Sequence, residues 1–123
     1  MFVYGTLRRG QRAWWRIEPH VCSAEPAHRR GTMYAFDAGY PGIVLTGDTL
    51  IAGELLQLVS PQAVLIELDA YEGDEFVRVM AEVETSSGLV PAWVYVVADA
   101  SLATGTRIPG GDWCAHVSGS ASG

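Results

Sequence analysis

Lysine is absent from this sequence of 123 residues, so its eight Lys/Arg positions are all arginine. The absence excludes Schiff-base catalysis and the phosphate-binding lysine of a P-loop. Fourteen acidic residues give a formal net charge of −6, whereas a protein that neutralises nucleic-acid phosphates needs the opposite balance. Arginines do interleave with Trp14 and Trp15 over residues 8–16, a pattern that can bind single strands. The acidic balance favours a Trp pair packed on the core instead, and we expect no nucleic-acid partner.

Signals for membranes and metals are also missing. No apolar run approaches the ~20 residues that span a bilayer, and no basic leader precedes an apolar stretch at the N-terminus. We therefore expect a cytoplasmic protein without a membrane partner, in which Cys22 and Cys114 are free thiols. The motifs GxSxG, HExxH, CxxC and GxGxxG do not occur, and the three histidines are scattered. These absences argue against a metal site and against a dinucleotide.

The length and the 49% hydrophobic content indicate a single folded domain. We place this domain at residues 1–116 and expect residues 117–123, which are rich in Ser and Gly, to form a flexible tail. Strands are expected at residues 2–4, 31–36, 49–59, 76–84 and 89–97, with a loop over 37–42 and a hairpin turn at 86–88.

Two helices are expected. The first covers residues 11–18 and ends before Pro19. The second begins at Pro61, behind Ser60 as its N-cap, and stops at Gly73. In the strand that follows, alternation places Val77, Val79, Ala81 and Val83 on one face, and Pro91 indicates an edge or a bulge in its partner. Because the strands come partly as hairpins rather than as βαβ units, an α+β fold is favoured.

The segment from Tyr4 to Gly10 is a first candidate for a functional site. A β-type run there ends in Gly5 and Thr6. Successive backbone N–H groups in such a turn can point into one concavity and hold a carboxylate or a developing oxyanion, and glycine allows a ligand to approach closely. The alternative is a plain turn from a strand into a loop.

The acidic segment Glu67–Arg78 is a second candidate, and its spacing does not fit an EF-hand. Glu72 lies at the C-terminal end of the expected helix, where exposed carbonyls disfavour a negative charge. Asp69 precedes it by one turn, and like charges at that spacing raise the pKa of a carboxyl group. Such a carboxyl can serve as a general base near neutral pH. The alternative is a solvated acidic helix end.

Motifs along residues 2–113 occur in the order of one known family. They are Tyr4-Gly5-Thr6-Leu7-Arg8-Arg9-Gly10, Tyr40-Pro41-Gly42-Ile43, Leu68-Asp69-Ala70-Tyr71-Glu72-Gly73 with Phe76-Val77-Arg78, Ala92-Trp93-Val94-Tyr95-Val96, and Ile108-Pro109-Gly110-Gly111-Asp112-Trp113. The sequence thereby resembles the γ-glutamylcyclotransferase-like (AIG2-like) family. The resemblance implies a small mixed β-barrel flanked by a few helices, with the site in a cavity at one side.

The resemblance also implies an activity and its residues. The α-amine of a γ-glutamyl amide attacks the side-chain carbonyl and releases 5-oxoproline and a free amine, with no metal or cofactor. Glu72 is the implied general acid/base. The backbone of Tyr4, Gly5, Thr6 and Leu7 is expected to bind the γ-glutamyl portion of this small-molecule substrate.

Three further residues are expected at the substrate. Tyr40 lines the pocket or packs beside Pro41 as a loop residue. Phe76 stands where relatives usually carry Tyr, so an aromatic wall is kept and a hydroxyl is lost. Arg78 orients Glu72 or anchors a substrate carboxylate, unless it pairs structurally with Glu82 or Asp69.

Two alternatives to this enzyme stay open. A module of the same fold that binds a carboxylate without turnover is one, and Phe76 is the feature that motivates it. A different acyl or amide transfer at the same loop and glutamate is the other. The leaving amine and the oligomeric state are not set by the sequence.

Overall fold

A computed structural model describes residues 1–99 and 105–122 of the chain, with side chains described as far as residue 118. Its strands are β1 (Phe2–Val3), β2 (Val21–Ala35), β3 (Pro41–Leu58), β4 (Phe76–Thr85), β5 (Gly88–Val97) and β6 (Thr106–Arg107). Its helices are α1 (Pro61–Glu72) and α2 (Trp113–Ser122), with 3₁₀ turns η1 (Trp14–Arg16), η2 (Glu18–His20) and η3 (Gly73–Glu75). None of the helices in these described ranges has the length and apolar composition that crossing a bilayer requires.

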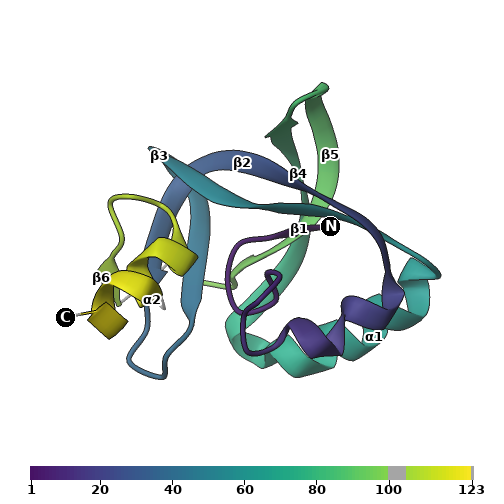
Figure 1. Cartoon of the computed structure of the whole chain (residues 1–123), viewed down its shortest axis with the longest axis horizontal. Coiled ribbons are helices and arrows are strands. Elements are labelled where there is room, and N and C mark those ends of the chain that lie inside the picture. Colours follow the sequence, from purple (N-terminus) through teal and green to yellow (C-terminus); the bar gives the residue numbers. More distant parts are fainter. Residues whose placement is uncertain (100–104, 123) are drawn as a thin grey trace.

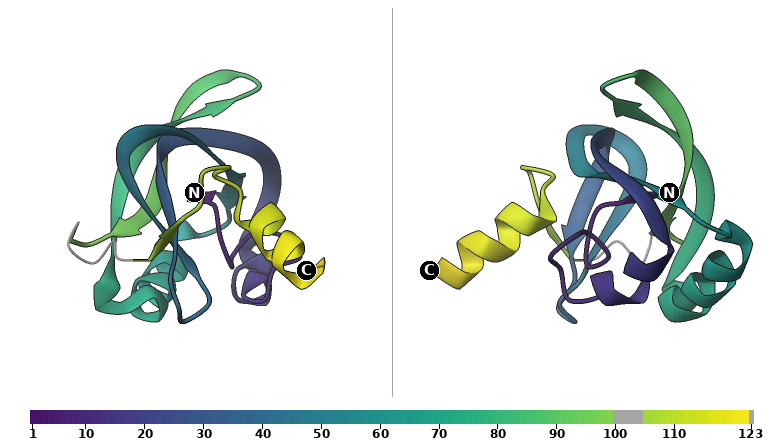
Figure 2. Two further views of the ribbon diagram at one scale, coloured as in Figure 1. Left: turned by 90° about the vertical axis from the view of Figure 1, so that its left-hand side faces the viewer. Right: turned by 45° about the vertical axis from the view of Figure 1, so that its right-hand side comes forward.

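The strands form one antiparallel sheet in the order β1-β3-β2-β4-β5, with β6 paired to β2. The long β2–β3 hairpin runs from the pair Val21–Leu58 to the pair Ala35–Pro41 and shifts register between Gly31 and Thr32. Figures 1 and 2 show these strands bending around a common centre. Within the described chain β1 and β5 do not pair as strands, so the sheet makes an open barrel. The expected α+β fold with a small mixed barrel and a few helices is confirmed.

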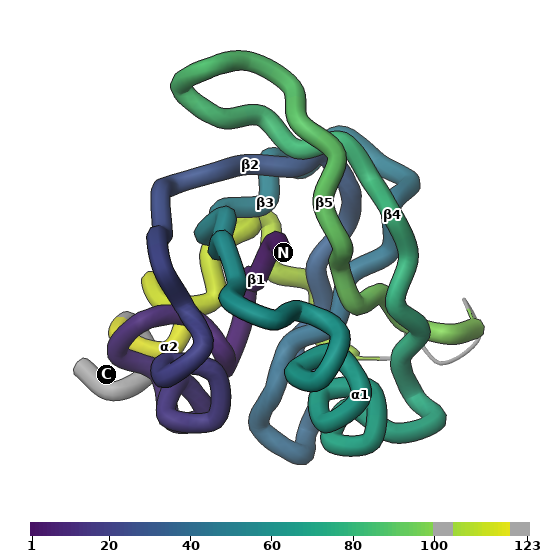
Figure 3. The backbone as a smooth tube through the Cα atoms, turned by 90° about the vertical axis from the view of Figure 1, so that its right-hand side faces the viewer, coloured from purple at the N-terminus to yellow at the C-terminus, as the bar shows by residue number. Residues whose placement is uncertain are grey.

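Two groups of buried side chains stabilise the sheet and pack α1 against it. One lies within the curl of the sheet and contains Phe2, Met33, Ile51 and Val94. The other lies beneath α1 and includes Ile17, Leu56, Val64, Leu68 and Tyr95. Figures 1 and 3 show α1 beside the N-terminal segment at one end of the sheet. The second group therefore fixes the end of α1 against the loop that follows β1.

Helix α1 agrees with its predicted bounds. Val64, Leu65 and Leu68 are buried along one face, as their spacing indicates. Gly73 follows the helix with a φ of 70° and donates its N–H to the carbonyl of Asp69. Ser60 does occupy the N-cap position, but its φ is 50° and its side chain makes no capping hydrogen bond. The expected cap is therefore absent, and burial of the apolar face with Pro61 in the first turn defines the start.

The predicted helix at residues 11–18 is wrong. The chain there forms η1 and η2, whose backbone hydrogen bonds join residues three apart, for example Ile17 N–H to the carbonyl of Trp14 at 3.0 Å. Pro19 lies inside η2 instead of ending a helix. Ala13 and Ile17 are buried, and the N–H of Ala13 donates to the carbonyl of Thr6 at 2.9 Å. Tertiary anchoring of this short segment outweighs its modest helix preference.

Two strands begin earlier than predicted. Strand β2 begins at Val21 rather than at residue 31, and β3 begins at Pro41 rather than at residue 49. The loop expected over residues 37–42 is therefore shorter. The residues by which these strands exceed the prediction are largely half-buried or exposed. They therefore lack the alternation of apolar and polar residues from which a strand is predicted. Strand β5 ends the sheet, which confirms the edge position expected for Pro91.

In β4 the second half follows the predicted alternation, because Ala81 and Val83 are buried. The first half does not follow it, because Val77 is 43% exposed and Phe76, expected on the opposite face, packs on the core. After Trp113 the backbone is helical to Ser122, an element that the small polar residues there do not suggest. The flexibility expected for residues 117–123 stays a prediction.

Candidate active site

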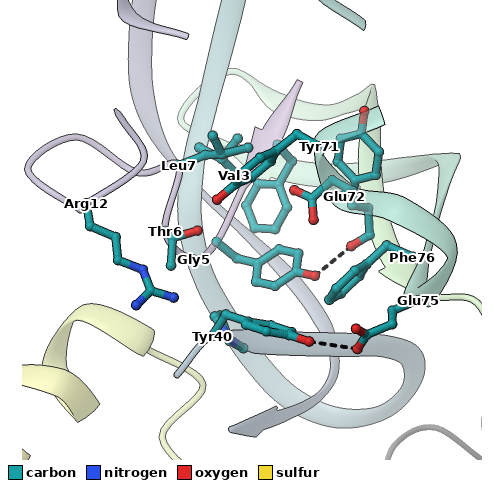
Figure 4. Close-up of a pocket in the computed structure, with 14 residues that line it drawn as sticks. Val3, Gly5, Thr6, Leu7, Arg12, Tyr40, Tyr71, Glu72, Glu75 and Phe76 are labelled. Carbon is teal, nitrogen blue, oxygen red and sulfur yellow. Dashed lines mark hydrogen bonds between the residues drawn. The ribbon is translucent and has the colours of Figure 1, made fainter. Parts of the chain in front are cut away.

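A cavity of about 260 Å³ lies where the loop after β1 meets the end of α1. The N-terminal segment from Phe2 to Leu7 forms one side, and Glu72 with η3 and the start of β4 forms another. Further walls come from Tyr40 in the loop before β3, from Pro41 at the start of β3, and from Tyr95 of β5. Figure 4 shows the side chains that surround the cavity. Residues 4–7 and Glu72, far apart in sequence, thus share one hollow.

The loop after β1 is held tightly enough to present its backbone to the cavity. The N–H of Arg8 donates to the carbonyl of Gly5 at 3.0 Å, which closes a turn. A Cβ atom at Gly5 would lie 2.6 Å from Cγ of Pro41, so a side chain does not fit there. In the part of the chain that the structure describes, no protein acceptor pairs with the N–H groups of Thr6 and Leu7. These two donors are available to a ligand.

Glu72 is the last residue of α1, and its carboxyl group faces the cavity (Figure 4). Burial raises the pKa of this carboxyl from 4.5 to about 7. The helix end and the charge of Asp69, predicted above as the causes, are not what shifts it. Near neutral pH the carboxyl is populated in both protonation states, as a group that accepts and returns a proton requires.

Asp69 is turned away into a polar network of its own. It accepts hydrogen bonds from Nε and Nη2 of Arg78 at 2.9 and 3.1 Å, and from the hydroxyl of Tyr95 at 2.6 Å. The Arg78 hydrogen bond is the main cause that lowers the pKa of Asp69. The hydroxyl of Tyr4 donates to the carbonyl of Tyr95 at 2.7 Å. The network thus links α1, β4, β5 and the residue before Gly5.

Arg78 does not line the cavity. Its guanidinium lies over the ring of Trp93 at 4.3 Å and pairs with Asp69, which was one of the alternatives predicted for it. The structure favours this structural pairing with Asp69, and the substrate contact expected of Arg78 stays a prediction. Tyr4 does line the cavity, and burial, followed by the charge of Glu72, raises the pKa of its phenol, so the phenol stays protonated.

Tyr40 and Phe76 form an aromatic wall. Their rings lie 6.0 Å apart, and Phe36 packs on the other side of Tyr40 at 5.6 Å. The hydroxyl of Tyr40 donates to Oε2 of Glu75 at 2.7 Å, and this hydrogen bond is the main cause that raises the pKa of Tyr40. The hydrogen bond ties the loop between β2 and β3 to η3 across the cavity wall.

The sequence analysis did not assign several lining residues to the site, among them the polar side chains of Arg12, Tyr71 and Glu75. Arg12 was one of the arginines that interleave with Trp14 and Trp15, Tyr71 lay within the second expected helix, and Glu75 belonged to the acidic segment Glu67–Arg78. Local patterns carry no signal for their shared location. Among residues 1–99 and 105–122, no group of three or more His, Cys, Asp or Glu side chains is placed to hold a metal ion.

The open barrel thus carries one cavity that is lined both by the loop after β1, with its unpaired N–H groups, and by the half-buried carboxyl of Glu72. The chain belongs to the family described as "Gamma-glutamyl cyclotransferase, AIG2-like", whose model matches residues 1–115. It is 31% identical over 102 residues to the gamma-L-glutamyl-butirosin B gamma-glutamyl cyclotransferase of Niallia circulans, covering 78% of this chain and 65% of that protein.

The "Putative gamma-glutamylcyclotransferase YkqA" of Bacillus subtilis is 29% identical over 94% of this chain and 41% of its own length. The crystal structure of YkqA matches with a TM-score of 0.81 over 100% of this chain and 42% of that chain. An AIG2-like protein from Mus musculus shares the fold, with a TM-score of 0.66 and 20% identity over 89% of this chain and 84% of its own. The chain therefore spans about two-thirds or less of the two curated relatives described here.

Proposed function

We propose that this protein is a cyclotransferase that cleaves a small γ-glutamyl amide and releases 5-oxoproline and a free amine. The observation that carries the proposal is the location of Glu72, with its pKa of about 7, in the same cavity as Thr6 and Leu7, whose N–H groups find no acceptor within the described chain. The family and the printed activities of its relatives support γ-glutamyl chemistry in particular.

In the first half of the reaction, Glu72 removes a proton from the α-ammonium group of the substrate. The freed amine nitrogen attacks the γ-carbonyl carbon, so a C–N bond forms and the carbonyl electron pair moves to oxygen. The N–H groups of Thr6 and Leu7 stabilise this oxyanion or hold the α-carboxylate, a role supported by their lack of an acceptor within the described chain. Because amine and carbonyl belong to one molecule, holding the glutamyl chain folded supplies much of the rate.

In the second half, the protonated carboxyl of Glu72 gives its proton to the nitrogen of the leaving amine. The oxyanion collapses and the original amide C–N bond breaks. The ring nitrogen gives up its second proton, which leaves with the released amine as its ammonium form, so the neutral lactam 5-oxoproline remains and Glu72 is again a carboxylate. A carboxyl whose pKa is near the working pH suits both transfers, since neither protonation state is strongly disfavoured. No step calls for a cofactor. The cytoplasmic location and the lack of nucleic-acid and membrane partners stay predictions.

The test is an assay for 5-oxoproline with a panel of γ-glutamyl amines and γ-glutamyl amino acids. Glu72→Gln keeps the size and hydrogen-bonding capacity of the side chain but cannot accept the proton, so we expect turnover to fall by at least about 100-fold. Glu67→Gln is the matched control, because Glu67 is exposed on the same helix and does not line the cavity. Activity retained in Glu72→Gln would remove Glu72 from the mechanism.

A binding module without turnover is the second candidate, and it rests on Phe76. A phenylalanine in the cavity wall supplies an aromatic surface without the hydroxyl that the resemblance associates with this position. Thermal stabilisation by γ-glutamyl amides without any 5-oxoproline would support this candidate, and product formation by the unmodified protein would exclude it.

A further inference from the structure

Arg12 brings a cationic side chain to the cavity lining, and within the described residues it forms no ion pair with a carboxylate. Its Nη2 atom donates to the backbone carbonyl of Gly39 at 2.9 Å. Among residues 1–99 and 105–122, ion pairs to arginine are made by Arg8, Arg9 and Arg78 instead. The remaining donors of the Arg12 guanidinium are thus available to an anionic ligand.

Charge is distributed unevenly around the cavity. Figure 4 shows Arg12 on one side and the carboxyl groups of Glu72 and Glu75 on the opposite side. Glu75 accepts a hydrogen bond from Tyr40, whereas Glu72 is half-buried and has a raised pKa. A substrate that extends across the cavity from Glu72 therefore passes from an acidic side to a basic one.

Burial decides which portion of the substrate meets Arg12. Tyr4, Gly5 and Leu7 are buried, whereas Arg12 lines the cavity but is exposed to solvent. We call this exposed side of the cavity its mouth. In the proposed reaction both the attacking amine and the scissile nitrogen must reach Glu72, so the γ-glutamyl portion occupies the interior. The group attached beyond the scissile nitrogen then extends toward the mouth.

Resting on the proposed function, we infer that Arg12 is a specificity-determining residue that binds an anionic group on the leaving portion of the substrate. The substrate class is then γ-glutamyl amino acids or γ-glutamyl peptides, whose leaving portion carries a carboxylate. Substrates whose leaving portion is uncharged are poorer. Substrates whose leaving portion carries an ammonium group are the poorest, because Arg12 repels this group at the mouth of the cavity.

Three substrates of similar length isolate the charge. They are γ-glutamylglycine, its neutral amide γ-glutamylglycinamide, and γ-glutamylethylenediamine, which ends in an ammonium group. We expect kcat/KM to decrease in that order, with a preference of about 5- to 10-fold for the carboxylate over the amide, as suits a charge-assisted contact at an exposed position. Since the contact is exposed, the preference should shrink as the salt concentration rises.

Arg12→Gln should abolish this preference by lowering kcat/KM for γ-glutamylglycine to about that for γ-glutamylglycinamide, while Arg12→Lys should keep most of the preference. Arg30→Gln is the matched control, because Arg30 likewise donates to one backbone carbonyl, that of Asp48, and lies outside the cavity lining. An equal loss on all three substrates in Arg12→Gln would mean that Arg12 serves the shared γ-glutamyl portion, and would overturn the inference. An unmodified protein without a preference would overturn it as well.

Calorimetric binding to Glu72→Gln, in which turnover is blocked, separates this inference from the proposed function. Affinities for the three compounds that follow the same order, and lose it in Glu72→Gln/Arg12→Gln, support the role of Arg12 even if the unmodified protein yields no 5-oxoproline. In that case only the proposed function fails. Equal affinities for the three compounds would overturn the role of Arg12, whether or not the unmodified protein forms 5-oxoproline.

Discussion

Replacement of Glu72 by glutamine should change the stability of this protein in a way that depends on pH. The carboxyl group titrates at about 7 in the folded protein and at 4.5 when it is fully solvated, because burial disfavours its charged form. Between these values the native state binds more protons than the unfolded state, so stability falls as pH rises. Below pH 4.5 the group is protonated in both states, and the penalty is absent.

The size of the effect follows from the two pKa values. Each pKa unit corresponds to about 1.4 kcal/mol, so full ionisation of Glu72 costs the folded state about 3 kcal/mol. Glutamine cannot ionise and escapes this penalty. Relative to the unmodified protein, Glu72→Gln should therefore gain about 3 kcal/mol of unfolding free energy between pH 4.5 and pH 8, on top of any constant difference between the two side chains.

Urea unfolding at several values between pH 4.5 and pH 8 measures this difference. Glu67→Gln serves again as the control and should track the unmodified protein, because Glu67 is exposed. A stability difference between Glu72→Gln and the unmodified protein that stays constant with pH would refute the reasoning, since it would show that Glu72 is not buried as a titrating group. The same titration should appear in kcat/KM, which should rise with an apparent pKa near 7 as the base loses its proton.

Two other predictions concern the support of the site. Asp69→Asn should have the opposite pH dependence from Glu72→Gln: the pKa of Asp69 is lowered, chiefly by Arg78, so its stabilisation is present above pH 3.8 and is lost as pH falls. Because the Asp69–Arg78 pair is partly exposed, we expect a loss of about 1 kcal/mol in urea unfolding at pH 7 that disappears in acid; an equal loss at both would contradict the ion pair. Gly5→Ala places a methyl group against Pro41 and should displace the donors of Thr6 and Leu7, lowering 5-oxoproline formation by about 100-fold. Unchanged kinetics in a folded Gly5→Ala protein would separate this loop from catalysis.

Elements whose structure is set by neighbours in the chain were predicted well. Helix α1 has Pro61 in its first turn, an apolar stripe and Gly73 after its end, all within one short segment. The hairpin of β4 and β5 is likewise local, since Gly88 follows a tight turn with a φ of 108°. Residues 11–20 show the limit of such signals, because burial of Ala13 and Ile17 by distant parts of the chain selects 3₁₀ turns over a helix.

In the candidate site, too, some features depend on adjacent residues and others on tertiary packing. A glycine turn after the first strand and a glutamate at the end of the helix are both evident in the residues themselves, because each depends on adjacent positions. Long-range packing brings the two to one cavity, buries Glu72 so that desolvation rather than Asp69 raises its pKa, and leaves Arg12 at the mouth while Arg78 lies outside. The cavity that holds Glu72 is lined in part by residues of β1, β3 and β5, and no local pattern specifies which residues those strands bring together.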